Sequence, residues 1–144
     1  QLVLDKSIAN LRKQRGNRQY GIDNTGIACL ANGWDNIHGG IYRDGMHDGR
    51  IVVTDKEWWQ NFESLTGFLD SYQATEDERY LDTFIKLWEF DRKYFYNPEV
   101  GESRQLLLAD GTPVIDDTGN QWKCIYHTDR AMMECCLRIE SLTE

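Results

Sequence analysis

Apolar side chains recur every three or four residues along two stretches in the middle of the chain, which predicts amphipathic helices at 54–73 and 75–96. The first stripe consists of Trp58, Phe62, Leu65, Leu69 and Tyr72. The second consists of Leu81, Phe84, Ile85, Trp88 and Phe95. Each stretch opens with a threonine followed three residues later by a glutamate, the spacing of a capping box at Thr54–Glu57 and Thr75–Glu78. The Asn97-Pro98 pair predicts the end of the second helix, because the residue before a proline avoids the helical region.

Weaker patterns predict further helices at 2–14, 20–32 and 128–141. In the last of these we expect an inward face formed by Met132, Met133, Cys136, Leu137 and Ile139. Two β-hairpins are predicted, one pairing 39–43 with 50–53 and one pairing 106–108 with 113–115, each around an Asp-Gly turn. No βαβ pattern occurs, so we predict an all-α fold, in which helix hairpins with short β-hairpin flaps at one end build part of an α/α barrel, or toroid.

Size and composition narrow the class of protein. The 144 residues predict a single domain. A net charge of −8 argues against a nucleic-acid partner, and the lack of a run of about 18 apolar residues argues against a membrane span. The four cysteines show no CxxC spacing, which indicates reduced thiols and a cytoplasmic protein. No metal-ligand spacing and no nucleotide-binding motif is present, so we expect neither a metal nor a cofactor.

The chain opens at Gln1 with no capping residue before its first predicted helix. We therefore expect that it begins inside a structural element, and that residues 1–144 are the C-terminal portion of one catalytic domain.

Trp59 and Glu63 form the first candidate for chemistry. They lie one helical turn apart, on a different face from the buried Trp58 stripe. A tryptophan beside a carboxylate suits a sugar site, because the ring stacks on the C–H face of the sugar while the carboxylate accepts hydrogen bonds from hydroxyls. The alternative interpretation is an ordinary exposed aromatic residue beside a surface glutamate.

His127, Arg130 and Glu134 form the second candidate. They follow one another on a single face of the last predicted helix, opposite its methionine and cysteine face. Histidine is the usual proton carrier near neutral pH, and an arginine one turn away would stabilise a developing oxyanion. The alternative interpretation is a histidine at a helix N-terminus beside a surface ion pair.

Six short motifs in this order resemble the N-acylglucosamine 2-epimerase family, with its cellobiose 2-epimerase and aldose–ketose isomerase branches. The resemblance covers about residues 33–141. The matching segments are Gly33-Trp34-Asp35 with His38-Gly39-Gly40-Ile41-Tyr42, K-x-W-W-x-x-x-E at 56–63, Thr75-Glu76-Asp77, Gly101-Glu102, Asp110-Gly111, and W-K-x-x-x-H-x-x-R at 122–130. One position departs from the pattern: where the family usually has an aromatic residue after Gly-Glu, this chain has Ser103.

The resemblance implies a barrel of six α-hairpins, of which this chain matches the C-terminal part. It implies proton transfer at C2 of an open-chain aldose through an enediolate, between two histidines on opposite faces of the sugar. His127 matches the later histidine, with Glu63 and Arg130 as catalytic partners. Trp58, Trp59, Glu102 and Trp122 are expected to bind substrate. The earlier histidine belongs to a G-H-x-x-E motif that this chain does not contain.

Several points stay open at this level. The sugar, the choice between epimerase and isomerase, and the assembly are undetermined, with a homodimer as one option. One alternative function is an α/α-toroid glycoside hydrolase or lyase, although a glycosidase needs two opposed carboxylic acids and Glu63 has no evident partner. Another is a non-enzymatic helical interaction module, which predicts that Trp59 and His127 lie far apart.

Overall fold

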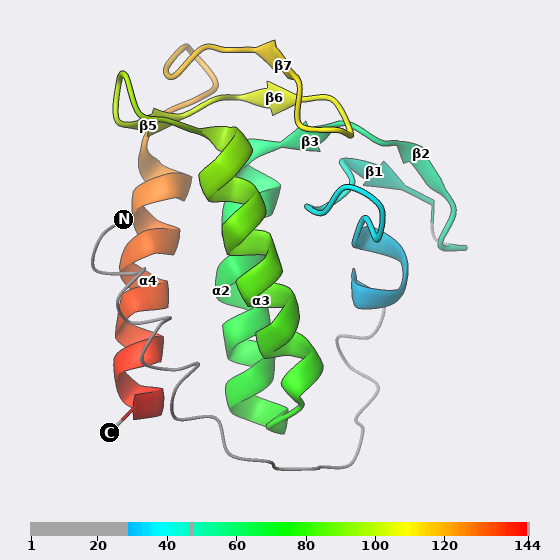
Figure 1. Ribbon diagram of the computed structural model, residues 1–144, viewed down its shortest axis with the longest axis vertical. Helices are drawn as coiled ribbons and strands as arrows, with labels where there is room; N and C mark the ends of the chain where they lie inside the picture. The colour runs from blue at the N-terminus through cyan, green and yellow to red at the C-terminus, as the bar shows by residue number, and fades with distance from the viewer. Residues whose placement is uncertain (1–28, 47, 144) are drawn as a thin grey trace.

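The computed structural model describes residues 29–46 and 48–143. The longest elements of this part are three helices, α2 (Trp58–Thr75), α3 (Glu78–Phe90) and α4 (Tyr126–Thr143). They lie side by side, with short strands gathered across one end (Figure 1). The predicted helix at 2–14 and most of the one at 20–32 lie outside the described residues. Cys29–Gly33 forms a single π-helical turn.

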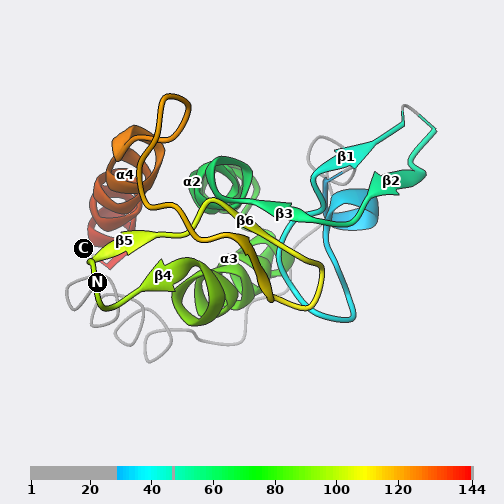
Figure 2. The ribbon, with the colours of Figure 1, turned by 90° about the horizontal axis from the view of Figure 1, so that it is seen from above.

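The direction of the helices decides which residues meet. Helices α2 and α4 both begin at the strand-bearing end and run away from it, whereas α3 returns toward it (Figure 1). Helix α2 packs against both of the others (Figure 2). The first turns of α2 and α4 therefore lie next to each other, although more than 60 residues separate Trp58 from Tyr126 in the sequence.

The strands form three small antiparallel sheets. The largest has the order β3 (Lys56–Glu57), β6 (Leu106–Leu107) and β7 (Pro113–Ile115), which confirms the second predicted hairpin and adds a strand to it. The first predicted hairpin is only partly right. Its outer strand β2 (Ile51–Val53) pairs with β1 (Asp44–Gly45), while Ile41 forms an isolated bridge with Trp34. A third pair joins β4 (Tyr96–Asn97) to β5 (Glu102–Ser103).

Neither predicted capping box forms. Lys56 and Glu57 pair with β6, so α2 starts four residues later than expected, and Glu57 makes no side-chain cap. The tertiary strand pairing therefore overrides the local capping signal. At the next helix, Thr75 is still part of α2, and the N-cap is Asp77, which accepts a hydrogen bond from the Arg79 backbone N–H at 3.0 Å.

Helix α3 continues as a π-helical segment, η2 (Asp91–Phe95), which ends at Tyr96. The predicted stop before Asn97-Pro98 is thus confirmed, but the helical geometry changes six residues before Asn97.

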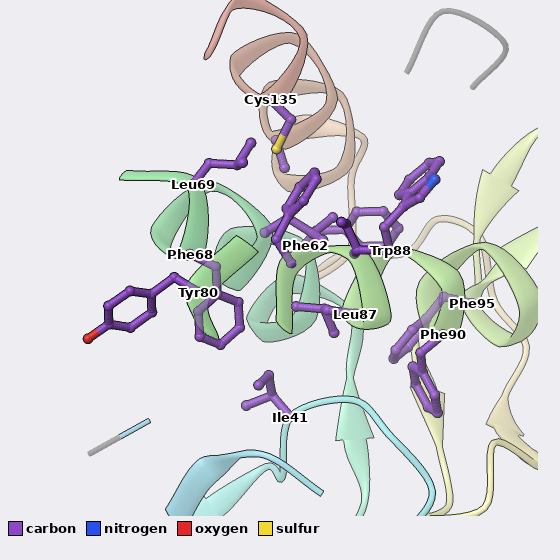
Figure 3. Close-up of a cluster of buried hydrophobic side chains, with 14 of the residues drawn as sticks. Ile41, Phe62, Phe68, Leu69, Tyr80, Leu87, Trp88, Phe90, Phe95 and Cys135 are labelled. Atoms are coloured by element: carbon purple, nitrogen blue, oxygen red, sulfur yellow. The ribbon is translucent and has the colours of Figure 1, made fainter. Parts of the chain in front are cut away.

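The core lies where the three helices meet (Figure 3). The predicted apolar stripes of α2 and α3 supply most of it, and Phe62, Leu65, Leu81 and Phe84 are almost completely buried. The predicted inward face of the last helix was partly wrong, since Met133 and Leu137 are each 62% exposed. Ile139 is buried as predicted, and Ala131 and Cys135, which were not predicted, are buried with it.

A buried ion pair fixes the loop before β1 to strand β3, which directly precedes α2. The Lys56 ammonium donates to Asp35 Oδ2 at 2.8 Å, and both side chains are at most 1% exposed. Asn61 of α2 accepts a hydrogen bond from the Ile41 backbone N–H at 2.8 Å. Gly40 makes this approach possible: its φ is +79°, and a Cβ there would lie 2.8 Å from the Phe90 ring.

Candidate active site

Glu63 is the centre of a cluster that joins α2 to α4. One carboxylate oxygen, Oε1, lies 2.7 Å from His127 Nδ1, and the other, Oε2, contacts the Arg130 guanidinium. The side chains of all three residues are between 24% and 35% exposed, so the cluster is partly open. Glu63 and His127 are 64 positions apart in the sequence. The two motifs that contain them, K-x-W-W-x-x-x-E and W-K-x-x-x-H-x-x-R, therefore meet at one carboxylate.

Aromatic rings surround His127. The Trp59 ring lies with its centroid 6.0 Å from the imidazole and is 42% exposed, so it offers a free face beside the histidine. The Tyr126 ring stands edge-on to His127 at 5.1 Å. This close approach of Trp59 and His127 contradicts the expectation of the interaction-module hypothesis.

Trp58 differs from Trp59 in its burial. Its side chain is only 4% exposed and belongs to the core, and its ring meets His127 edge-on at 6.2 Å. That Trp58 binds substrate stays a prediction; in the described residues its ring packs in the core next to the imidazole.

Glu102 is held by hydrogen bonds from within the chain. Its Oε1 accepts from the Ser103 hydroxyl at 2.8 Å, from the Thr128 hydroxyl at 3.0 Å and from the Lys123 ammonium at 3.3 Å. Burial acts to raise the pKa of Glu102, but the hydrogen bonds from Ser103, the charge of Lys123 and the hydroxyl of Thr128 outweigh it, and the pKa is lowered. Glu102 was expected to bind substrate, but its Oε1 is occupied by these hydrogen bonds, which connect β5 to the first turn of α4.

Ser103 stands directly after Gly101-Glu102, where the family pattern has an aromatic residue. It is completely buried, and its hydroxyl lies 3.2 Å from Thr128 Oγ1 as well as donating to Glu102. Thr128, the residue after His127, therefore packs against the small polar side chain of Ser103, where the family pattern would place an aromatic ring.

Two other predicted residues lie at the edge of the site or outside it. Trp122 is 78% exposed on the loop that precedes α4, where the Trp122 backbone N–H donates to Asn120 Oδ1 at 2.8 Å. Glu134 does not join the Glu63 cluster, because its carboxylate pairs with Arg138 one turn further along α4.

The cavity next to the Glu63 cluster has a different lining. A cavity of about 240 Å³ lies beside the start of α4, but it is lined by Glu102 and Thr128 and not by Glu63 or His127. Contacts of the described residues bring Trp59, Glu63, His127 and Arg130 together, with side chains that are partly exposed.

Sequence reasoning missed the residues that hold this end of α4 in place. Lys123, Ser103 and Thr128 are all nearly buried, and each contacts Glu102. The W-K pair at 122–123 belongs to a family motif, but a lysine beside a tryptophan in a polar loop gives no hint that it is buried. Serine and threonine at the other two positions read as ordinary turn residues.

Two general features complete the description of residues 29–46 and 48–143. In this part of the chain, no group of three or more histidine, cysteine or acidic side chains is placed to hold a metal ion. No helix within it has the length and apolar character needed to cross a membrane.

The chain belongs to the N-acylglucosamine 2-epimerase family, whose sequence profile matches residues 12–131. It is 30% identical over 129 residues to N-acylglucosamine 2-epimerase from Bos taurus, covering 85% of this chain and 31% of that protein. It is 35% identical over 93 residues to cellobiose 2-epimerase from Ruminococcus albus, covering 63% of this chain and 24% of that protein.

Solved structures give the same result for the fold. A D-mannose isomerase superposes with a TM-score of 0.69 at 25% identity, covering 81% of this chain and 29% of that chain. Cellobiose 2-epimerase from Spirochaeta thermophila superposes with a TM-score of 0.68 at 29% identity, covering 82% of this chain and 28% of that chain. The chain thus spans about a third or less of the length of the relatives it matches.

Proposed function

We propose that the protein is a sugar 2-epimerase or aldose–ketose isomerase that transfers a proton at C2 of an open-chain aldose through an enediolate. The observation that carries the proposal is the Glu63 carboxylate bound to both His127 and Arg130. One cluster then contains a proton carrier in His127, the carboxylate that orients it in Glu63 and a permanent cation in Arg130. The exposed ring of Trp59 lies beside it.

His127 is the proton carrier in this proposal. An ionised carboxylate only accepts hydrogen bonds, so Glu63 favours the tautomer in which His127 Nδ1 carries the hydrogen. The lone pair then lies on Nε2, on the opposite side of the ring, where it can take the C2 proton. Glu63 stabilises the imidazolium that forms, as the carboxylate does in a catalytic triad.

Arg130 has two roles in this arrangement. Its contact with Glu63 fixes the carboxylate, and so indirectly fixes His127. Its Nε–H is buried and has no hydrogen-bond partner among the described residues. The rest of the guanidinium is partly exposed, so its terminal N–H groups can bind the oxygen that gains negative charge as the enediolate forms, where preorganised donors contribute most to catalysis.

The remaining residues bind or position. Trp59 at the start of α2 and Trp122 on the loop before α4 are exposed aromatic rings, and we assign them to stacking against the sugar. Glu102 is assigned as a positioning residue, because it anchors Thr128 and hence the first turn of α4 that carries His127.

The test is exchange of the C2 proton in deuterated water with a panel of aldoses, using the full-length gene product. We expect His127→Ala to lower the exchange rate by about 100-fold or more, the usual size of a general-base contribution. The melting temperature of the same variant separates this from a structural role. A stable variant that keeps more than about a tenth of the rate would remove His127 from the mechanism.

Glu63→Gln is the matched second variant. It keeps the shape of the side chain but no longer provides a charged acceptor to His127 and Arg130, so we expect a fall in kcat with a smaller change in KM. A variant that changes KM alone would assign Glu63 to substrate binding.

The glycosidase or lyase alternative is not favoured by the cluster. A glycosidase needs one carboxylic acid that is protonated and a second one opposite it. Glu63 is instead paired with a guanidinium, which favours the ionised form. Release of reducing sugar from a glycoside by the full-length gene product would revive this alternative.

Three wider expectations belong to the same proposal. We expect the described helices to be one sector of a closed α/α barrel, in line with the longer relatives. We also propose a cytoplasmic protein, consistent with the free thiols of Cys124, Cys135 and Cys136. Sedimentation analysis of the full-length gene product would decide whether it forms a homodimer.

A further inference from the structure

A separate cavity of about 240 Å³ lies between the end of α3, the β4–β5 hairpin and the first turns of α4. Its lining consists of Phe62, Trp88, Asp91, Arg92, Tyr96, Gly101, Glu102, Thr128, Asp129 and Met132. One water needs only about 10–15 Å³ of such volume, so the cavity has room for a small molecule. None of the proposed catalytic residues Glu63, His127 and Arg130 is part of this lining.

Asp91 is the unusual residue of this cavity. It is fully buried where α3 passes into the π-helical segment, and neither of its carboxyl oxygens has a hydrogen-bond partner among the described residues. Burial raises the pKa of Asp91 well above its ordinary value. An unpaired buried carboxyl is costly to the fold, so a residue of this kind calls for a ligand or another explanation.

The other groups around the cavity favour a cation as the occupant. Glu102 and Asp129 bring two more carboxylates, and Arg92 is the only basic side chain among the lining residues. The pKa of Glu102 is lowered, because its hydrogen bonds and Lys123 outweigh its burial, so Glu102 keeps its negative charge. The lining therefore contains three carboxyl side chains and one guanidinium.

The walls suit an organic cation better than a hydrated metal ion. Phe62 and Trp88, which lie in the layer between α3 and α4 (Figure 3), provide aromatic surface, and Met132 adds an apolar contact. Aromatic faces attract alkylammonium groups through their quadrupole, and an ammonium has three donors for the two free oxygens of a carboxylate.

We propose that this cavity binds a small aliphatic ammonium ion, with the ammonium group on Asp91 and the carbon chain against Phe62, Trp88 and Met132. A neutral alcohol of the same shape can donate to only one of the two Asp91 oxygens and gains no charge attraction. Glu102 and Thr128, whose hydrogen bond helps to hold α4, both line the cavity, so its occupant would be bound next to the helix that carries His127.

Binding must be linked to a proton. In the pH range in which Asp91 is protonated in the empty cavity, binding of the ammonium ion converts it to a carboxylate, and its proton leaves to the solvent. The groups that face Asp91 across the cavity are Arg92, Tyr96, Glu102 and Asp129. Because the pKa of Asp91 is raised in the empty cavity, affinity for the ammonium ion rises as the pH rises toward that pKa.

The experiment is a calorimetric titration of the full-length gene product with n-butylammonium chloride, with 1-butanol as the neutral probe of matching shape. Ionic strength is held constant with potassium chloride. Titrations in buffers of different ionisation enthalpy count the protons released. We expect butylammonium to bind at least about tenfold more tightly than butanol and to release a substantial fraction of one proton.

Asp91→Asn is the decisive variant, because it preserves shape and removes the charge. We expect it to weaken butylammonium binding at least about tenfold and to abolish proton release, while leaving butanol binding unchanged. The control is Asp117→Asn, an equal charge change at an exposed loop residue that is not part of the cavity lining, and it should stay within about twofold of the wild type.

Each other outcome overturns the proposal. Equal binding of butanol and butylammonium would mean an apolar cavity with no cation preference, and no binding of either would leave ordered water as the occupant. Tight butylammonium binding by Asp91→Asn would place the ammonium elsewhere. The proton count on the wild-type protein needs no variant, so the proposal stays testable even if Asp91→Asn fails to fold. Failure of this site would leave the C2-proton exchange of the proposed function untouched.

Discussion

Two buried aspartates, Asp35 in the loop before β1 and Asp91 at the end of α3, carry the same side chain in opposite surroundings. Both are at most 1% exposed. Asp35 accepts from the Lys56 ammonium at 2.8 Å and from the backbone N–H groups of Ile37 and His38 at 2.8 and 3.1 Å. Asp91 has no hydrogen-bond partner among the described residues.

The difference shows that partners, and not burial alone, decide the charge of a buried carboxyl. Burial acts to raise the pKa of Asp35, but the bonds from Lys56, His38 and Ile37 outweigh it, and the pKa is lowered. For Asp91 burial acts without opposition, and the pKa is raised. The first carboxylate stabilises the fold, while the second is a cost that only a ligand would offset.

Breaking the Asp35–Lys56 pair should have the largest effect. Lys56→Met removes the cation and leaves a charged Asp35 buried with its two backbone donors only. Breaking a buried pair in this way costs about 3–5 kcal/mol, so we expect a fall of that size in the free energy of unfolding, measured with urea at neutral pH.

The double variant Lys56→Met with Asp35→Asn is the control for this prediction. Asparagine keeps an oxygen for the backbone N–H groups and removes the stranded charge, so the double variant should recover part of the loss. A double variant as unstable as the single one would show that the packing of Lys56 against the Tyr42 ring matters more than the ion pair.

Asp91→Asn should act in the opposite direction and depend on pH. A carboxyl whose pKa is raised in the fold binds its proton more tightly there than in the unfolded chain. Its penalty is therefore absent below the ordinary value of 3.8 and grows as the pH rises toward the folded pKa. We expect the variant to equal the wild type at acid pH and to be more stable by about 1–3 kcal/mol at neutral pH.

Thermal unfolding of both proteins across this range, without added amine, checks the Asp91 prediction. A difference that does not change with pH would mean that Asp91 does not titrate in the folded state. That result would also weaken the comparison with Asp35.

Glu102→Gln should have the smallest effect on stability. Glu102 has hydrogen-bond partners, as Asp35 does, but it is only partly buried. Its pKa is lowered, so its contribution is fully present above the ordinary value of 4.5 and is lost as the pH falls through the lower folded pKa. We expect the variant to lose about 1 kcal/mol of stability at neutral pH and nothing at strongly acid pH. Urea unfolding at both pH values measures this, and a loss that persists in acid would assign Glu102 a steric role.

The catalytic cluster was more predictable than the residues that support it. Glu63, His127 and Arg130 stand out because each lies at a regular spacing on an expected helix, next to aromatic residues that also match a family motif. Lys123, Ser103 and Thr128 carry no such signal. Their importance comes from sharing the carboxylate of Glu102, which lies more than 20 residues away from Lys123 and Thr128.

By itself the sequence determined the main helices, the β6–β7 hairpin and the family, because apolar periodicity and turn residues act over a few neighbouring positions. Only the tertiary structure decided where α2 begins, which face of α4 points inward and which aspartate has a partner. The pairing of Lys56 and Glu57 with β6 overrides a local capping signal, and packing against α2 turns Ala131 and Cys135 inward in place of Met133. These outcomes depend on contacts between residues far apart in the chain, and no local pattern specifies which distant group will be the neighbour.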